Sequence, residues 1–146
     1  MQGDSEMGES CKNLVEKFYH RIWNNKEEEV AFYIMDEYVT FRGSLGFQAR
    51  GIQEFLDYLR SVHRALGNYT CRIEDIVEEK EKTAVKLTFK GYHQGRFFGV
   101  DGTGREIQWA GVAFFHISNG KICDVWVLGD VSDIKRQLGF DENGRP

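Results

Sequence analysis

The sequence from residue 105 to residue 139 reads REIQWAGVAFFHISNGKICDVWVLGDVSDIKRQLG. It contains two runs with strand-like residue types, 105–117 and 121–128, joined by Asn119-Gly120. That dipeptide is typical of a tight turn between antiparallel strands. Both faces of the first run are apolar, which predicts a central strand that is covered on both sides. The stretch therefore predicts a β-hairpin, and the residues after it predict a short amphipathic helix.

Asp130 stands where the second of these strands ends. Because burial raises the pKa of a carboxyl group toward neutrality, an Asp at the end of an apolar strand is a candidate acid or base. Asp130 or Ser132 is equally suited to cap the helix predicted at 134–138 through a side-chain oxygen. In a regular strand Asp130 has the parity of Trp126, so its carboxylate is expected on the side of that indole. Both roles of Asp130 remain open.

The rest of the chain shows helical spacing first and strand-like spacing afterwards. The predicted helices are 14–23, 26–34 and 51–66, and the predicted strands before the hairpin are 36–42, 70–79 and 83–93. The period of the apolar residues changes from that of a helix to that of a strand after Asn68. Helices followed by consecutive antiparallel strands indicate an α+β fold, in which the helices pack on one side of a single curled sheet.

The length of 146 residues suits one domain with a sizeable core. We expect that domain at 11–140, between a flexible tail at 1–10 and a second tail at 141–146. Apolar residues make up 41% of the chain and aromatic residues 14%, which excludes global disorder. The many aromatic residues also suit a pocket for a small apolar or aromatic ligand.

Charge and cysteine content exclude several classes of partner. The formal net charge is −4 and there is no dense basic block, so we expect no nucleic acid partner. No apolar run approaches the roughly 18 residues of a membrane span, so we expect no membrane partner and a cytoplasmic location. Cys11, Cys71 and Cys123 lack paired spacing, which predicts reduced thiols and argues against a structural zinc site. We expect neither a metal nor a cofactor.

Two further residues are candidates for a functional site. His93 shares a face of its strand with apolar residues, where a His is either a satisfied core residue or, beside a cavity, a proton carrier. Arg42 precedes a glycine-containing break at 43–46. Its guanidinium either pairs with a nearby acid or anchors a ligand carbonyl or carboxylate by forked hydrogen bonds.

Short motifs agree in order and spacing with the predicted strands. They are RGSLG at 42–46, GYHQGRFFG at 91–99, GTGR at 102–105, NGKI at 119–122, WVLGD at 126–130 and QLG at 137–139. Together they resemble the SnoaL-like ester cyclases, polyketide cyclases of the NTF2-like superfamily, over residues 14–139. The resemblance implies an NTF2-like cone, with a curled antiparallel sheet, about three N-terminal helices and a short C-terminal helix.

The resemblance also implies a reaction, the intramolecular aldol-type ring closure of a polyketide-like ester or another apolar carbonyl compound. Asp130 matches the family's acid–base position, and His93, in a Gly-x-His-x-Gly segment, would polarise the accepting carbonyl or orient Asp130. The chemistry would need no metal and no organic cofactor. The residues expected to contact the ligand are Arg42, Trp109, Phe115, His116 and Trp126.

The chain departs from the family pattern at two places. The segment at 48–51 lacks the His that often stands beside its Gly, and Gly102 replaces a Pro. An isomerase, a dehydratase or an epoxide hydrolase of the same fold is an alternative. So is a non-catalytic module that binds a ligand or a partner, in which Asp130 only caps the helix. A sheet covered by helices on one side leaves its other face for a second copy, and with the resemblance this predicts a homodimer.

Overall fold

The computed structural model describes residues 10–145. Most of the predicted N-terminal tail, 1–9, and residue 146 lie outside the described residues. The division into a domain at 11–140 with a tail on either side stays a prediction.

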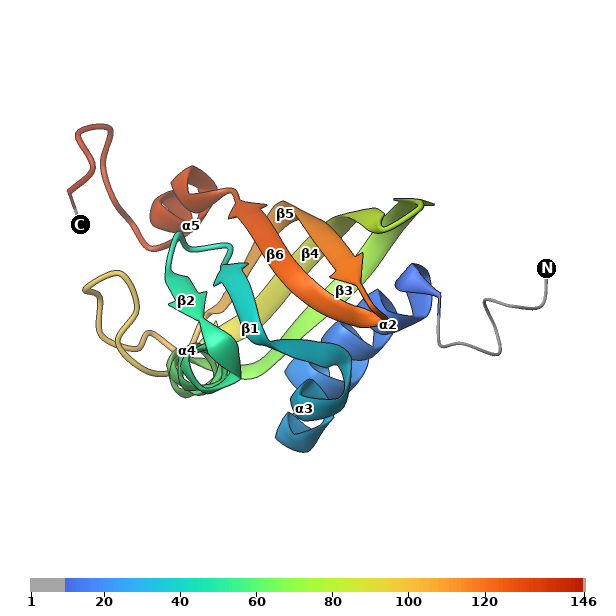
Figure 1. Ribbon diagram of the computed structural model, residues 1–146. Coiled ribbons are helices and arrows are strands. Elements are labelled where there is room, and N and C mark those ends of the chain that lie inside the picture. The colour runs from blue at the N-terminus through green and yellow to red at the C-terminus, as the bar shows by residue number, and fades with distance from the viewer. Residues whose placement is uncertain (1–9, 146) are drawn as a thin grey trace.

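The chain forms helices and strands in the expected order (Figure 1). The helical segments are α2 (Cys11–Lys17), the π-helix η1 (Phe18–Asn24), the 3-10 turn η2 (Glu28–Val30), α3 (Ala31–Ile34), α4 (Gly51–Ala65) and α5 (Val131–Gln137). The strands are β1 (Met35–Arg42), β2 (Gln48–Arg50), β3 (Leu66–Glu79), β4 (Lys82–His93), β5 (Glu106–Ser118) and β6 (Lys121–Gly129).

The six strands form one sheet in the order β2-β1-β6-β5-β4-β3. Four of the five neighbouring pairs are antiparallel, whereas β1 and β6 run parallel. The α+β prediction is confirmed, but the expectation of an antiparallel sheet is wrong for this pair. The reason is that β1 joins the sheet beside the last strand of the chain, with no turn to that strand to fix an antiparallel direction.

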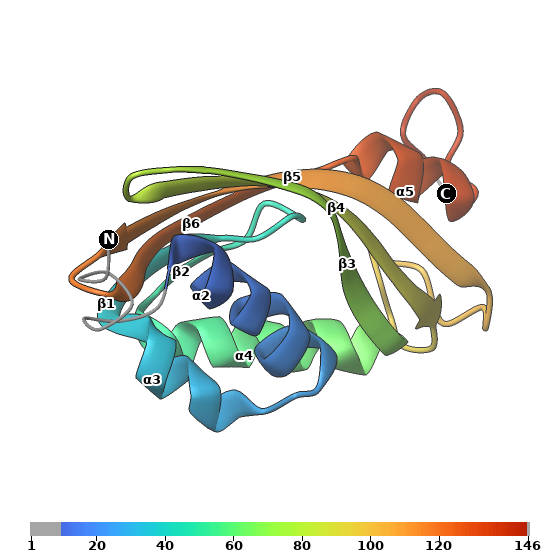
Figure 2. The same ribbon diagram turned by 90° about the vertical axis from the view of Figure 1, so that its right-hand side faces the viewer.

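The curled sheet arches over the helices, and we call the side that faces them the concave face (Figure 2). The helices α2, α3 and α4 lie on that side, as predicted. The short helix α5 contacts β5 through Gln137, whose side chain forms hydrogen bonds of 2.6 and 3.1 Å with the Gln108 backbone. The layers therefore enclose one core, between the concave face and the helices.

Local features explain how the helical layer begins and ends. The Ser10 hydroxyl caps α2 by accepting a hydrogen bond of 3.2 Å from the backbone N–H of Asn13. At the end of η1 the Asn24 amide donates to the Cys71 carbonyl at 2.9 Å and accepts from the Cys71 N–H at 2.8 Å. These two bonds fasten the helical layer to β3, an edge strand whose outer polar groups would otherwise lack partners.

One strand was not predicted, and several element boundaries differ from the predictions, most of all those of β3 and α5. The polar strand β2 has no alternating apolar pattern, so periodicity did not indicate it. The strand β3 begins at Leu66, before the predicted residue 70. The prediction missed this start because Asn68, at φ +50°, lies in an irregularity of the pairing with β4 that interrupts the two-residue period. The helix α5 begins before residue 134, directly after its cap at Asp130.

On the other side of the sheet, which we call the convex face, the described residues 10–145 leave large apolar side chains exposed. Its central side chains on β5 and β6 are Val112, Phe114, Trp126 and Leu128, which are 42, 53, 39 and 48% exposed. The expectation that β5 is covered on both faces is therefore wrong for a single chain. Within residues 10–145, none of the helices combines the length and the apolar character that crossing a membrane requires.

Candidate functional site

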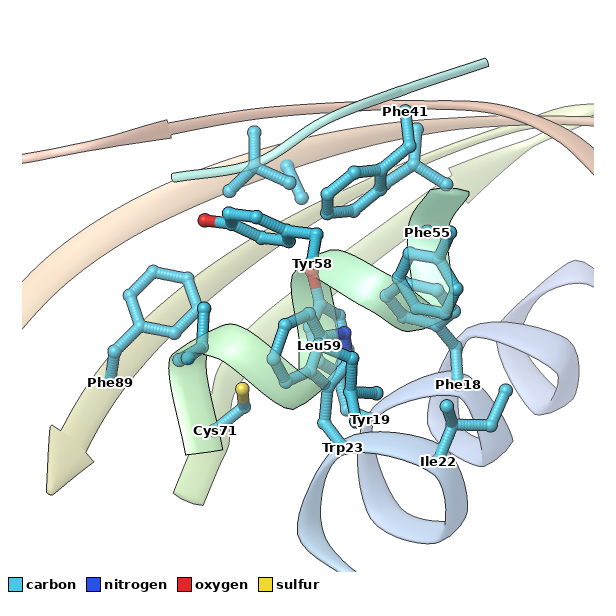
Figure 3. Close-up of a cluster of buried hydrophobic side chains, with 14 of the residues drawn as sticks. Phe18, Tyr19, Ile22, Trp23, Phe41, Phe55, Tyr58, Leu59, Cys71 and Phe89 are labelled. Atoms are coloured by element: carbon cyan, nitrogen blue, oxygen red, sulfur yellow. The ribbon is translucent and has the colours of Figure 1, made fainter. Parts of the chain in front are cut away.

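Aromatic side chains from the helices and from the sheet enclose a small cavity, which we call the inner chamber (Figure 3). Its free volume is about 10 Å³, close to the room that one water molecule needs. The lining residues are Phe18, Tyr19, Trp23, Phe41, Ser44, Tyr58, Tyr69, Cys71, Phe89 and Val127. The chain's own side chains therefore nearly fill the interior of the cone.

Trp109 forms a second aromatic layer behind this lining. Its ring lies 5.4 Å from the ring of Phe89 and 6.0 Å from that of Tyr69, measured between centroids. Gly111 makes room for the Phe89 ring against the sheet, because a Cβ at position 111 would lie only 2.5 Å from Cε2 of Phe89. The ring of Phe97, from the connection between β4 and β5, covers Trp109 at 6.2 Å.

The lining described here contains no acidic or basic side chain. Burial raises the pKa of the Tyr19 and Tyr69 hydroxyls well above the ordinary tyrosine value. Burial likewise raises the pKa of the Tyr58 hydroxyl and of the Cys71 thiol. All four groups are neutral near pH 7. Because transfer of an ion into such surroundings is costly, the chamber favours an uncharged ligand over a charged one.

Four buried side-chain atoms have no hydrogen-bond partner within residues 10–145. They are the hydroxyl oxygens of Tyr19 and Thr83, Nε2 of His63 and Nε1 of Trp109. The Tyr19 side chain lines the inner chamber, and the Trp109 indole packs directly behind it. Since nearly all buried polar groups in proteins are hydrogen-bonded, donors left unpaired beside a cavity mark the place where a ligand atom can bind.

A turn at residues 43–47 closes the chamber on one side. Ser44 lines the cavity, and the ring of Phe47 stacks on that of Tyr58 with 5.0 Å between centroids. A Cβ at Gly129 would lie 2.8 Å from the Ser44 carbonyl oxygen and 3.0 Å from Nε1 of Trp109. Gly129 therefore lets this turn pack closely against the sheet, beside the unpaired indole N–H.

Asp130 lies outside the chamber and caps α5. Its Oδ1 accepts a hydrogen bond of 3.1 Å from the Asp133 backbone N–H, and its residue is exposed to solvent. The strand β6 ends at Gly129, so the parity that Asp130 was expected to share with Trp126 stays untested, and Trp126 itself lies on the convex face. In this structure Asp130 therefore acts as the N-terminal cap of α5.

His93 is fully buried and holds the connection between β4 and β5. Its Nδ1 lies 3.0 Å from the Thr103 hydroxyl and its Nε2 lies 3.0 Å from the Val100 carbonyl oxygen. The expectation that His93 and Asp130 face one shared cavity is wrong, because one is enclosed by this connection and the other faces solvent. Both ring nitrogens of His93 are engaged in positioning the segment that carries Phe97.

The predicted ligand contacts divide between the two faces of the sheet. Trp109 and Phe115 face the interior, whereas Arg42, His116 and Trp126 face outward. A single cavity lined by all five is therefore a wrong expectation, because neighbouring residues of a strand point to opposite faces. Val127, next to Trp126, is the residue that lines the chamber.

The outward-facing residues have partners of their own. The Arg42 guanidinium lies 5.4 Å from the centroid of the Trp126 ring and donates a hydrogen bond to the Val127 carbonyl. Both side chains border an open groove of about 560 Å³ along β1, β2 and β6, which also contains Asp124 and Arg50. His116 lies 3.8 Å from the Glu81 carboxylate. This groove is open and charged, in contrast to the chamber.

His63 was not among the candidates from the sequence, yet it is the imidazole nearest the chamber wall. Its ring lies 5.9 Å from that of Trp23 and 5.7 Å from that of Tyr69. Burial lowers the pKa of His63, and the charge of Lys26 lowers it further. Spacing could have found it, because His63 follows Phe55 by eight positions and so continues the apolar face of α4.

No cluster of three or more His, Cys, Asp or Glu side chains suited to holding a metal ion occurs in the described part of the chain.

Comparisons with known proteins agree with this fold. The model of the SnoaL-like polyketide cyclase family matches residues 13–138. A candidate SnoaL-like polyketide cyclase from Jannaschia sp. CCS1 superposes with a TM-score of 0.82 at 15% identity, covering 97% of this chain and 99% of that one. IdmH, a candidate polyketide cyclase from Streptomyces antibioticus, gives a TM-score of 0.79 at 18% identity, covering 90% of this chain and 99% of that one.

A structure with a different described activity is also similar. AclR, a candidate hydroxylase from Streptomyces galilaeus, superposes with a TM-score of 0.76 at 19% identity, covering 88% of this chain and 95% of that one. No curated protein shows significant sequence similarity. The structures share the fold, and the predicted NTF2-like cone is confirmed. On the family match over residues 13–138, the chain belongs to the SnoaL-like polyketide cyclase family.

Proposed function

We propose that this chain is a cofactor-free acid–base enzyme of the cyclase type, which binds an uncharged apolar carbonyl compound in the inner chamber. The observation that carries the proposal is the indole N–H of Trp109, which is buried without an acceptor among the described residues. The Trp109 ring packs directly behind Phe89, a lining residue of an aromatic chamber whose groups are neutral. A ligand carbonyl oxygen is the acceptor that this donor lacks, and the aromatic lining suits the rest of such a ligand.

The proposed reaction is an intramolecular aldol-type ring closure. A base removes a proton from a carbon flanked by carbonyl groups, which leaves the negative charge on an enolate oxygen. A hydrogen bond from Trp109 stabilises that oxygen within the apolar chamber. The enolate carbon then attacks a second carbonyl carbon of the same molecule. A carbon–carbon bond forms, and the resulting alkoxide takes the proton back.

Asp130, which lies outside the closed chamber, is the proposed proton carrier once the chamber has opened. It follows Gly129, whose Cα faces both the Ser44 turn and the Trp109 indole nitrogen. One carboxylate oxygen of Asp130 accepts the cap bond from Asp133, and the other has no hydrogen bond among the contacts of residues 10–145. His93 assists as a positioning residue, because it holds the segment whose Phe97 covers Trp109.

Ligand binding requires the chamber to expand, because its free volume is about 10 Å³. The turn at 43–47 is the part of the wall best suited to move. Its residues Gly46 and Phe47 are exposed, and it is held by short-range bonds, of 2.8 Å from the Gly43 N–H to the Phe47 carbonyl and of 2.9 Å from the Gly46 N–H to the Gly43 carbonyl. Lifting this turn from Gly129 would open the chamber beside Trp109 and Asp130.

A non-catalytic ligand-binding module is the second candidate. It is favoured by the exposed position of Asp130 and by its hydrogen bond to the helix. In that case the chamber binds the same class of compound, but no proton transfer follows.

Asp130→Asn separates the two candidates. Asn caps a helix about as well as Asp, so the melting temperature should not change. The proton-carrying oxygen is lost, so we expect the protein-dependent exchange of the methylene protons of ethyl benzoylacetate in D2O to fall about a hundredfold. Nuclear magnetic resonance measures this exchange at several protein concentrations.

Two matched variants serve as controls for this exchange measurement. Asp133→Asn changes a carboxylate in the same helical turn, and His63→Gln removes the competing imidazole; both should keep the wild-type rate. Exchange at the wild-type rate by Asp130→Asn contradicts the role of Asp130. If the wild-type chain binds the ester but does not accelerate the exchange, the protein is a non-catalytic ligand-binding module.

The lowered pKa of His63 makes a prediction about stability. In the folded chain His63 takes up a proton less readily than in the unfolded chain, whose imidazoles titrate near about pH 6.5. Stability is therefore complete above that pH and is lost as the pH falls toward the folded-state pKa, because the unfolded state binds more protons. Urea unfolding at about pH 7.5 and about pH 5 should show a smaller loss for His63→Gln than for the wild type. An equal loss would show that His63 does not bind protons differently in the two states.

We further propose that the chain forms a homodimer through the convex face. The exposed apolar side chains Val112 and Phe114 of β5 border an apolar depression of about 210 Å³, which Val77 and Ala84 also line. A twofold axis through this face would let the projecting Phe114 of one copy fill the depression of the other. The face that a single chain leaves uncovered on β5 would then be buried.

Phe114→Lys tests this dimer. A charge at the centre of the buried patch should convert the dimer to a monomer, because its desolvation is not compensated. Light scattering at micromolar concentration measures the mass. Tyr33→Lys is the control, since Tyr33 is exposed on α3, away from the sheet, and it should leave the mass unchanged. A monomeric wild type at micromolar concentration contradicts the proposal.

The proposed location is the cytoplasm. Cys11, Cys71 and Cys123 are all free thiols, and a reducing compartment maintains thiols in this state.

A further inference from the structure

The hydroxyl of Tyr19 is a polar group that the proposed reaction does not use. The side chain is 2% exposed, and its ring packs edge-on against Phe18 at 4.9 Å and against Phe115 at 5.8 Å. The hydroxyl oxygen has no hydrogen-bond partner anywhere in residues 10–145. A Phe at this position would make the same ring contacts, so packing explains the ring and leaves the oxygen unexplained.

Tyr19 reaches the chamber from an unusual segment. It belongs to η1, a π-helix, a conformation that is rare and occurs frequently at functional sites. The same segment supplies Phe18 and Trp23 to the chamber lining. The two bonds between Asn24 and the Cys71 backbone hold its end in place. The Tyr19 ring packs among the aromatic side chains of this cluster (Figure 3), its side chain lines the cavity, and its hydroxyl is unpaired among the described residues.

Two unpaired donors thus approach one chamber from different layers, Tyr19 in its lining and Trp109 directly behind the lining. Tyr19 comes from the helical layer and Trp109 from the sheet. Of the four described residues with an unpaired buried atom, Tyr19 is the one whose side chain lines the cavity; the side chains of Trp109, His63 and Thr83 do not line it. Burial keeps the Tyr19 hydroxyl protonated by raising its pKa, so it can donate to an uncharged acceptor.

We propose that Tyr19 is a second ligand-binding donor, which meets one oxygen of the ligand while Trp109 meets another. This inference rests on the proposed function, because it assumes that the carbonyl compound binds in the inner chamber. The chamber then selects uncharged ring compounds with two separated oxygen atoms over compounds of the same shape with one. Tyr19 is a specificity-determining residue in this account and carries no proton.

Two compounds of nearly equal shape test the selection. 4-Methoxyacetophenone has an acceptor oxygen at each end of its ring, and 4-ethylacetophenone has only the carbonyl. We expect the wild-type chain to bind the methoxy compound about three- to tenfold more tightly, as one net hydrogen bond implies. Tyr19→Phe should bind both compounds with the affinity that the wild type has for the ethyl compound. Quenching of tryptophan fluorescence measures the affinities.

The stability of Tyr19→Phe is the second measurement. Because the variant removes an unpaired buried oxygen and retains the ring, its urea midpoint should equal or exceed that of the wild type. Tyr38→Phe is the matched control. Tyr38 is 80% exposed on β1 and does not line the chamber, so its hydroxyl cannot contact a ligand there. Tyr38→Phe should keep the preference for the methoxy compound.

The outcomes separate this inference from the function on which it rests. If Tyr19→Phe keeps the preference, or unfolds at lower urea than the wild type, the hydroxyl has a different role and the inference is overturned. If the wild type binds both compounds equally and Trp109→Phe weakens both, the proposed function stands and the inference fails. If neither compound binds to the wild type, both fail.

Discussion

Side chains alternate across the sheet, and along β5 and β6 this alternation decides what each part of the protein can do. Trp109 and Phe115 point into the aromatic interior, whereas Phe114 and Trp126 point outward. The interior side chains meet the helices and nearly fill the space between the layers. The outward side chains form an apolar surface that the chain leaves uncovered. A chamber and a candidate interface thus arise from opposite faces of the same two strands.

Periodicity predicted most of the fold, because helical and strand spacing are distinct in this chain. The helices before the sheet, the Asn119-Gly120 turn and the consecutive strands all follow from local patterns. The parallel pairing of β1 with β6 could not be predicted in this way, because it joins segments far apart in the sequence. The short strand β2 lacks an apolar pattern and depends on its pairing with β1.

The candidate site was harder to predict than the fold. Parity could not show which face of β6 was inside, since both faces carry large apolar residues, and the strand ends before Asp130. His93 was expected on the interior side and is there, but its ring nitrogens bind the neighbouring connection. The unpaired donors of Tyr19 and Trp109 become visible only when every potential partner has been placed.

The interior of the chamber is neutral, and this decides which ligands it can bind. Burial keeps the Tyr and Cys groups of the chamber protonated, so the chamber can donate hydrogen bonds but has no charge to balance an ionic ligand. Proton transfer would then occur at Asp130, which lies outside the closed chamber in contact with water. The division between an uncharged binding site and a solvated carboxylate explains how one small domain could do both tasks.

The proposed binding of a ligand carbonyl oxygen by the indole N–H of Trp109 can be followed by titrating the nitrogen-15-labelled chain with 4-methoxyacetophenone. Trp23, Trp109 and Trp126 each give one indole N–H resonance. We expect the Trp109 resonance, assigned by its loss in Trp109→Phe, to move downfield while that of Trp126 on the convex face does not. Movement of the Trp126 resonance with that of Trp109 unchanged would contradict the proposal and place the ligand on the outer face of the sheet.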